Sequence, residues 1–357
     1  MSEGGLLALG WGEPFESAFQ IYADKGMLPA RIGVEHRNRY LAFTGITHSI
    51  DARLSGKLRQ HLKETGDRPV VGDWVAIKME GDSGIIHGRL PRKSQFSRKV
   101  AGRAVEEQVM AANIDVAFIA TALTGDLNPR RIERYLLMTW ESGAQPVILL
   151  TKADLAEDRE SAIDQVRTVA QVVPIHLISG RTGEGLPELD SYLTAGTTVA
   201  VLGSSGVGKS TLINRLLGTT ALRTGEVRDD GRGRHTTTYR ELVCLPSGAL
   251  MIDTPGLREL QLWESDAGLH EAFGDIEALA GECRFGNCEH RTEPDCAVRA
   301  AIANGTLTAN RLESYRRLGR ELKHIEEKAD ARARAERDRS ARNANQLLRK
   351  RLKEKGQ

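Results

Sequence analysis

The chain has 357 residues, enough for roughly two or three domains with buried cores. Its 50 Lys and Arg residues nearly balance its 48 Asp and Glu residues, so the net charge of +2 excludes a uniformly basic nucleic-acid binder. No apolar run is long enough to span a membrane, and Met1–Gly5 lacks the basic region of a signal peptide. We therefore expect a cytoplasmic protein with no membrane partner.

The N-terminal third of the sequence divides into two parts with different residue patterns. Residues 1–28 carry scattered apolar side chains such as Trp11 and Phe15, which predict a short helix packed on the body. From residue 29 to about 95, short β-prone pieces such as Val70–Ile77 alternate with Gly, Asn and Asp. We predict a small antiparallel barrel of the oligonucleotide-binding (OB) type as a domain over residues 29–100.

Basic residues recur in the loops of this predicted barrel and just after it. On a barrel they could line a groove for an oligonucleotide. The alternative, an ordinary solvated surface, stays open because acidic residues are interspersed and stacking aromatics are few. The basic residues are Arg37, Arg39, Arg53, Lys57, Arg59, Lys63, Arg68, Arg92, Lys93, Arg98, Lys99 and Arg103.

From residue 101 to 264 the pattern predicts an α/β domain with a parallel sheet, because strand-like and helix-like segments alternate. The expected strands are 114–120, 146–150, 175–178, 198–202, 241–245 and 249–252, and the expected helices are 129–141, 159–172, 185–193 and 211–217.

A phosphate-binding P-loop lies between one strand and the next helix of this domain. Glycines permit the tight turn that leaves backbone N–H groups free to surround an anion. Lys209 is expected to reach the terminal phosphates and Ser210 to ligate Mg²⁺. The candidate residues are Gly203, Ser204, Ser205, Gly206, Val207, Gly208, Lys209, Ser210 and Thr211.

Three further motifs follow predicted strands, at the edge where open α/β sheets bind ligands. Asp253 and Gly256 form a D-x-x-G motif, expected to hold the magnesium shell and to contact the γ-phosphate. Thr151, Lys152 and Asp154 fit the guanine-recognition motif, in which the aspartate accepts the two N–H donors of the base edge. Ser179 begins the loop expected to contact the guanine carbonyl.

The order of these motifs is informative. In ordinary small GTPases the P-loop comes first, whereas here both base motifs precede it. The sequence therefore predicts a circularly permuted domain. Permutation requires the original chain termini to lie close together, as they commonly do in compact domains.

A third domain is predicted over residues 265–330, followed by a basic tail over 331–357. Three thiolates and one imidazole, from Cys283, Cys288, His290 and Cys296, have the number and chemistry of a closed structural zinc site. We interpret Cys244, on a predicted strand, as a core thiol. Helices are expected at 297–304 and 309–328.

A permuted GTPase domain between an OB-like barrel and a Cys₃His zinc module resembles the ribosome small-subunit-dependent GTPase family called RsgA, YjeQ or YloQ. The matching elements are the P-loop, Gly233–Thr238, Asp253–Gly256 and the four zinc ligands. The resemblance implies GTP binding, hydrolysis stimulated by the small ribosomal subunit and its rRNA, and a role in late subunit maturation. Thr151 stands where the family has asparagine, so base orientation could be looser, and residues 1–28 are not the basic extension of some members.

Leu257 follows the D-x-x-G motif at a position where many GTPases have a water-orienting glutamine. We therefore expect slow intrinsic turnover. The sequence leaves His235 as the candidate for positioning water or as an exposed loop histidine, and favours Thr237 over Thr236 as the second magnesium ligand. We expect a monomer. Two other classes stay open: an RNA-binding assembly module that uses GTP only as a switch, and a P-loop enzyme that phosphorylates a metabolite.

Overall fold

The computed structural model describes residues 3–36, 39–65, 68–99, 107–125, 127–218, 241–253, 273–309, 311–317 and 319–320. The chain divides into two compact units. The first comprises residues 1–98 and 108–261, and the second comprises 99–107 and 262–357.

The first unit begins with two helices, α1 (Glu3–Leu7) and α2 (Glu13–Ala23), where the sequence predicted one. Helix α2 buries Phe15 and Phe19. Trp11 lies just before α2, and the centroid of its ring is 4.7 Å from that of Trp74 in the barrel. The N-terminal segment is thus packed onto the barrel through aromatic contacts.

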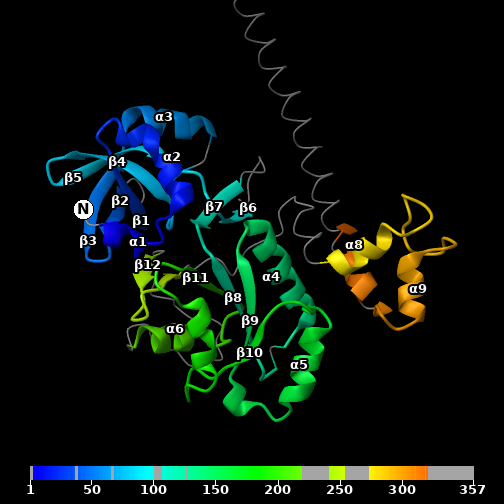
Figure 1. Cartoon of the computed structure of the whole chain (residues 1–357). Helices are drawn as coiled ribbons and strands as arrows, with labels where there is room; N and C mark the ends of the chain where they lie inside the picture. Colours follow the sequence, from blue (N-terminus) through cyan, green and yellow to red (C-terminus); the bar gives the residue numbers. More distant parts are fainter. Residues whose placement is uncertain are drawn as a thin grey trace, which may run out of the picture. The chain divides into compact units, whose positions relative to one another are not determined.

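Five strands form the predicted OB-like barrel (Figure 1), but it is not wholly antiparallel as expected, because β3 and β5 pair in parallel. β1 pairs with both β2 and β4, β2 with β3, and β3 with β5, which closes the circle by pairing with β4. Helix α3 lies between β3 and β4 and was not predicted. The bounds are β1 Leu28–His36, β2 Arg39–Gly45, β3 His48–Leu54, α3 Gly56–Thr65, β4 Trp74–Glu80 and β5 Ser83–Arg89.

The predicted parallel sheet follows, after the two-stranded pair β6 (Gln95–Lys99) and β7 (Glu107–Ala112). Its order is β10-β9-β8-β11-β13, and β12 joins β13 as an antiparallel edge. The strands are β8 Val116–Ala122, β9 Gln145–Thr151, β10 Ile175–Leu177, β11 Thr198–Leu202, β12 Glu241–Cys244 and β13 Leu250–Asp253.

Helices cover both faces of this sheet (Figure 1). Alternate strand residues such as Phe118 and Leu149 form a buried cluster with Leu212 of α6 and Leu189 of η2. Helices α4 and α5 lie on the other side of the sheet from α6 (Figure 1). The helices are α4 Pro129–Ser142, α5 Arg159–Arg167, the 3-10 helix η2 Leu186–Tyr192 and α6 Lys209–Leu217.

The barrel and the parallel sheet are continuous through one strand pair. Val34 of β1 is in register with Glu241 of β12, so the two sheets form a single eleven-stranded sheet. Because β12 directly follows residues 219–240, the chain leaves the region of the predicted switch and immediately contacts the barrel.

Arg31 of β1 is buried where the N-terminal segment, the barrel and the parallel sheet meet. Its guanidinium donates to the carbonyls of Leu9 (2.5 Å), Gly72 (3.1 Å) and Asn113 (2.9 Å). Burial lowers its pKa to about 10, so it remains charged at neutral pH. One side chain therefore ties together three segments of the first unit.

The second unit contains α8 (Gly274–Ala280) and α9 (Ala297–Ala303), close to the expected helix 297–304. The helix expected over 309–328 is seen in residues 311–317, and residues from 321 onward lie outside the described part. Within the described residues, no helix combines the length and apolar character needed to cross a membrane.

Candidate nucleotide and metal sites

The P-loop connects β11 to α6, as predicted, and its backbone requires glycine. Gly203 has φ +142°, and a Cβ there would lie 2.3 Å from the carbonyl oxygen of Ala120 on β8. Gly208 caps α6 in the left-handed conformation, with φ +98°. Ser210 and Thr211 lie in the first turn of α6, where backbone N–H groups without helical partners favour an anion.

The Lys209 ammonium lies at the P-loop itself. It donates to the carbonyl oxygen of Gly203 at 2.8 Å and also to that of Ser204. These contacts hold the positive charge beside the loop whose N–H groups are expected to surround the phosphates.

Thr151 links the base motif to the P-loop. At the end of β9, its hydroxyl donates to the carbonyl oxygen of Val207 at 2.5 Å. Both residues are buried. Thr151, which stands where the family has asparagine, therefore makes a hydrogen bond to the backbone of the phosphate loop.

Asp154 lies three residues after Thr151, in the short 3-10 helix η1 (Ala153–Leu155). Lys152 between them has φ +58° and ψ +37°, a left-handed conformation that turns the chain sharply at the end of β9. The Ala153 N–H donates to the Ile178 carbonyl (3.1 Å), which joins this turn to the serine loop after β10. The two predicted base loops are therefore adjacent.

The Asp154 carboxylate has partners from the serine loop. Oδ1 accepts the Ser179 hydroxyl at 2.5 Å, and Oδ2 accepts Nε (2.9 Å) and Nη2 (2.6 Å) of Arg181. These hydrogen bonds, Ser179 first and then Arg181, hold the pKa of Asp154 below its ordinary value. The Asp154 side chain is 10% exposed and that of Arg181 is 71% exposed.

The serine loop also packs against the P-loop helix. A Cβ at Gly180 would lie 3.1 Å from the side chain of Thr211 and 3.2 Å from the backbone N of Leu212. This close approach brings the predicted guanine loops and the phosphate loop to one edge of the sheet.

The D-x-x-G strand lies next to the P-loop strand. Ile252 of β13 is in register with Ala200 of β11, and Asp253 ends β13 at the same sheet edge. Gly256, His235 and Thr237, with Thr236 and Leu257, lie outside the described residues.

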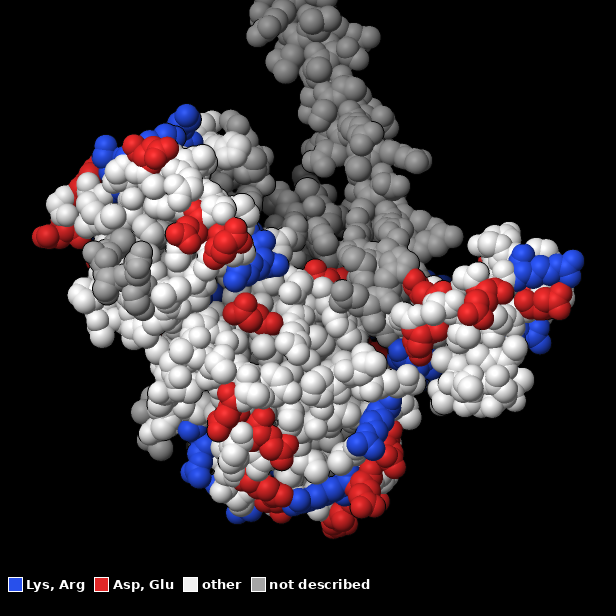
Figure 2. Space-filling model, in the orientation of Figure 1, with Lys and Arg blue, Asp and Glu red and all other residues white. Residues whose placement is uncertain are grey.

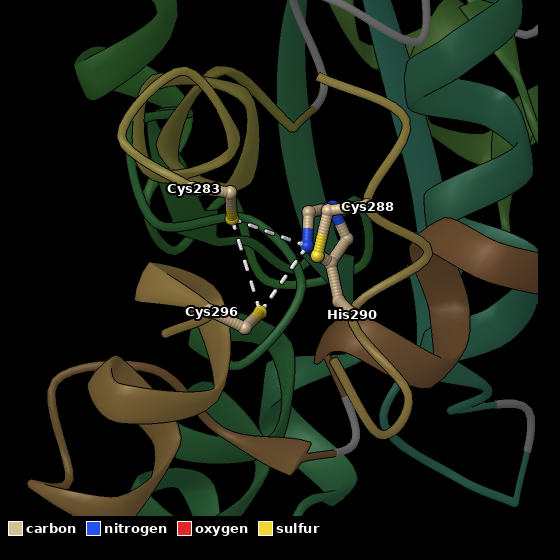
Figure 3. A group of neighbouring side chains, drawn as sticks. All are labelled: Cys283, Cys288, His290 and Cys296. Atoms are coloured by element: carbon tan, nitrogen blue, oxygen red, sulfur yellow. Dashed lines mark hydrogen bonds between the residues drawn. The ribbon is translucent and has the colours of Figure 1, made fainter. Parts of the chain in front are cut away.

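The four predicted metal ligands converge in the second unit (Figure 3). Cys283 follows α8, Cys288 and His290 lie in the connecting loop, and Cys296 is the N-cap of α9. Their ligand atoms all lie within 4.8 Å of one another. Arg316 supports the loop by donating to the carbonyl oxygen of His290 at 2.5 Å.

The spacing of these atoms fits a tetrahedral metal. Sγ of Cys283 lies 3.8 Å from Sγ of Cys296, and the two sulfurs lie 3.6 and 3.5 Å from Nδ1 of His290. Tetrahedral zinc with ordinary bond lengths would place two sulfurs about 3.8 Å apart and a sulfur and a nitrogen about 3.6 Å apart. The cluster can therefore hold a metal with no position left open for catalysis.

The basic residues of the predicted barrel groove have different surroundings. Arg92 does not belong to such a surface, because its side chain is only 5% exposed and forms a buried ion pair with Asp73. Arg53 pairs with Glu80 at 3.4 Å. Lys57 and Arg59 on α3 are exposed. In the view of Figure 2, acidic and basic side chains are intermixed on the described surface.

Arg181 was not identified from the sequence as a site residue. Its position in the serine loop, two residues after Ser179, is the signal that could have suggested it. Arg159 of α5 was also missed: it pairs with Glu184 (2.6 Å) and donates to the Ala153 carbonyl (2.7 Å), linking the two base loops a second time.

The fold and site define a class. Base loops that precede the P-loop in sequence, yet share its sheet edge, are those of a circularly permuted P-loop GTPase domain, here preceded by an OB-like barrel and followed by a Cys₃His cluster.

Comparisons with known proteins agree. The family model described as RsgA GTPase matches residues 89–263. "Small ribosomal subunit biogenesis GTPase RsgA" of Opitutus terrae is 46% identical over 347 residues, covering 94% of each chain. The protein of that name from Streptomyces avermitilis is 43% identical, over 93% of this chain and 89% of its own.

Solved structures share the fold. The crystal structure of YjeQ from Thermotoga maritima is 26% identical, with a TM-score of 0.64, covering 83% of this chain and 98% of its own. That of YloQ, a circularly permuted GTPase, is 24% identical, with a TM-score of 0.61, covering 84% and 96%. The chain belongs to the RsgA family of GTPases.

Proposed function

We propose that this protein binds the small ribosomal subunit and hydrolyses GTP when the subunit stimulates it, in a late step of subunit maturation. The observation that supports the proposal most is the convergence of the P-loop, the Asp154 loop and the end of β13 at one sheet edge. Close relatives that match nearly the whole chain are named small ribosomal subunit biogenesis GTPases.

The phosphates of GTP would be bound by the P-loop, from Gly203 to Thr211. Lys209 would exchange its carbonyl contacts for the terminal phosphates, as an ammonium in a P-loop does. Ser210 and Thr237 would ligate Mg²⁺, which neutralises phosphate charge when bound. Asp253 would hold the magnesium shell, and the Gly256 N–H would contact the γ-phosphate.

The guanine base would be recognised by Asp154. Its carboxylate can accept the two N–H donors that guanine presents and adenine lacks. Ser179 and its loop would contact the guanine carbonyl through the backbone. Thr151 and Lys152 would position the loop that carries Asp154, since the Thr151 hydroxyl is hydrogen-bonded to the Val207 carbonyl of the P-loop.

For hydrolysis, Leu257 cannot orient water, so another group must do so. His235 is our candidate, because the neighbouring glycines at 231 and 233 would let the segment rearrange when a partner orders it. In this proposal the subunit completes the catalytic site. The intrinsic rate would then be about 10⁻⁴ to 10⁻³ per second.

The Cys₃His cluster would hold one structural zinc ion per chain, as the thiolate and imidazole set and its spacing favour. The rRNA would be contacted through the barrel, the metal module or the basic tail. We infer that the protein acts as a monomer in the cytoplasm, where small subunits are assembled.

The test is single-turnover hydrolysis of GTP and ATP with no subunit, with purified small subunits and with purified large subunits. The proposal expects strong stimulation of GTP hydrolysis by small subunits alone. Binding to small subunits without stimulated hydrolysis would instead favour an assembly module that uses GTP only as a switch. Equal use of ATP would contradict guanine recognition and reopen a metabolite kinase.

A further inference from the structure

The carboxylate of Asp154 accepts hydrogen bonds from three side-chain donors of the serine loop. Ser179 Oγ donates to Oδ1, and Nε and Nη2 of Arg181 both donate to Oδ2. A carboxylate has about four acceptor positions, two on each oxygen. Both positions on Oδ2 are taken by Arg181.

Guanine recognition needs an acceptor position on each oxygen of the carboxylate. The base presents two N–H donors side by side, one for each oxygen of the carboxylate. Since Oδ2 already accepts two N–H groups of Arg181, at least one of them must leave before guanine can bind. Ser179 does not conflict in this way, because it takes only one of the two positions on Oδ1.

We propose that Arg181 is a latch on the base-recognition carboxylate, closed on Asp154 in the absence of guanine and displaced when guanine binds. The inference rests on the proposed role of Asp154. The latch competes with the base, so it lowers the affinity for both GTP and GDP and speeds release of the nucleotide.

The exposure of the two partners suits this role. The Arg181 side chain is 71% exposed and can swing into solvent, whereas Asp154 is 10% exposed and held by Ser179. An ion pair with one exposed partner contributes little net stability, so the base can displace it. Adenine would not, because it lacks the paired donors that replace those of the arginine.

Arg181→Ala should tighten GDP and GTP binding by about 2- to 5-fold, the range expected when an exposed ion pair no longer competes. Most of the change should appear as slower dissociation of a fluorescent GDP in stopped-flow measurements. Salt should shrink the difference between wild type and variant, because screening opens the latch in the wild type. Arg181→Lys, which keeps the charge, should stay near wild type.

Arg159→Ala is the matched control. It removes another ion pair of the serine loop, the one between Arg159 of α5 and Glu184, and the hydrogen bond to the Ala153 carbonyl, without removing a donor from Asp154. It should not tighten nucleotide binding. If both variants tightened binding equally, looser loops would be the cause and the latch would be rejected. Unchanged or weaker GDP binding in Arg181→Ala would also overturn it.

Asp154→Asn separates this inference from the proposed function. It should weaken GDP binding and favour xanthosine diphosphate, and adding Arg181→Ala should then leave xanthosine diphosphate affinity unchanged. If Asp154→Asn kept full GDP affinity, the base site itself would be wrong. If it lost affinity but Arg181→Ala tightened nothing, only the latch would fail.

Discussion

At the scale of single residues, Thr151 shows how one substitution in a motif is accommodated. The sequence suggested that losing the family's asparagine could loosen the base. Base orientation stays a prediction, and in the structure the threonine hydroxyl donates to the Val207 carbonyl of the P-loop. A short hydroxyl on β9 can thus make a link between base loop and phosphate loop.

We predict that Thr151→Val, which keeps the shape but removes the hydroxyl, weakens GTP binding about 3- to 10-fold. The Val207 carbonyl would lose its buried donor, which costs roughly 1 kcal/mol. Calorimetric titration with GDP and with a non-hydrolysable GTP analogue would measure the loss. Thr151→Ser should retain most of the affinity, and equal affinities for Val and Ser would show that the hydroxyl is not needed.

A second prediction at this scale concerns His235. His235→Ala should leave GTP affinity and small-subunit binding nearly unchanged while reducing subunit-stimulated hydrolysis by about 10² or more, the effect of a lost positioning group. Slow hydrolysis without subunits should hardly change. Full stimulated turnover in the variant would assign water positioning to rRNA or to another side chain.

At the scale of elements, the metal module depends on a loop between two short helices. α8 and α9 have seven residues each, too short to be stable alone in water. Their connection carries the ligands, and Glu293 folds it by accepting the N–H groups of Glu289, Arg291 and Thr292. The bound metal is therefore expected to be the main source of order in this module.

We predict that Cys288→Ser lowers zinc content from one per chain and exposes residues 270–300 to protease, because metal binding and folding are coupled in such modules. Nucleotide affinity should persist. Cys244→Ser is the control, since Cys244 lies on β12, outside the cluster, and should keep its zinc. Full zinc and unchanged proteolysis in Cys288→Ser would contradict the site, as measured by elemental analysis and limited digestion.

At the scale of the whole molecule, the barrel and nucleotide domain are joined by two devices within the first unit. One is the β1–β12 pair at Val34 and Glu241, and the other is Arg31 with its three carbonyl partners. The β1–β12 pair lies at the start of β12, which follows the predicted switch in the sequence. These contacts hold the barrel and the parallel sheet together as one compact unit.

We predict that Arg31→Met destabilises the protein by roughly 2–4 kcal/mol, because three buried carbonyls lose a charged donor. Denaturant unfolding would measure the change. Arg53→Met is the control: Arg53 forms an exposed ion pair with Glu80, so its loss should stay within about 0.5 kcal/mol. Similar effects of the two variants would show that Arg31 does not anchor the unit.

The sequence by itself determined the fold class, the order of the nucleotide motifs and the four residues of the Cys₃His cluster. Each of these depends on local requirements: glycines for the P-loop turn, alternating apolar strands for the sheet, and four ligands within fourteen residues for the metal. Such features need only a few neighbouring residues. The roles assigned to the site residues stay predictions, and the residues at 235, 237 and 256 also lie outside the described part.

Only the tertiary structure decided what individual charges do. Arg31, Arg92 and Arg181 look alike in the sequence, yet one is buried among carbonyls, one pairs with buried Asp73, and one closes on Asp154. The joining of β1 to β12, more than 200 residues apart, was equally invisible. The energy of a charge or an unpaired strand edge depends on the partners and burial that distant segments supply, and no local pattern contains them.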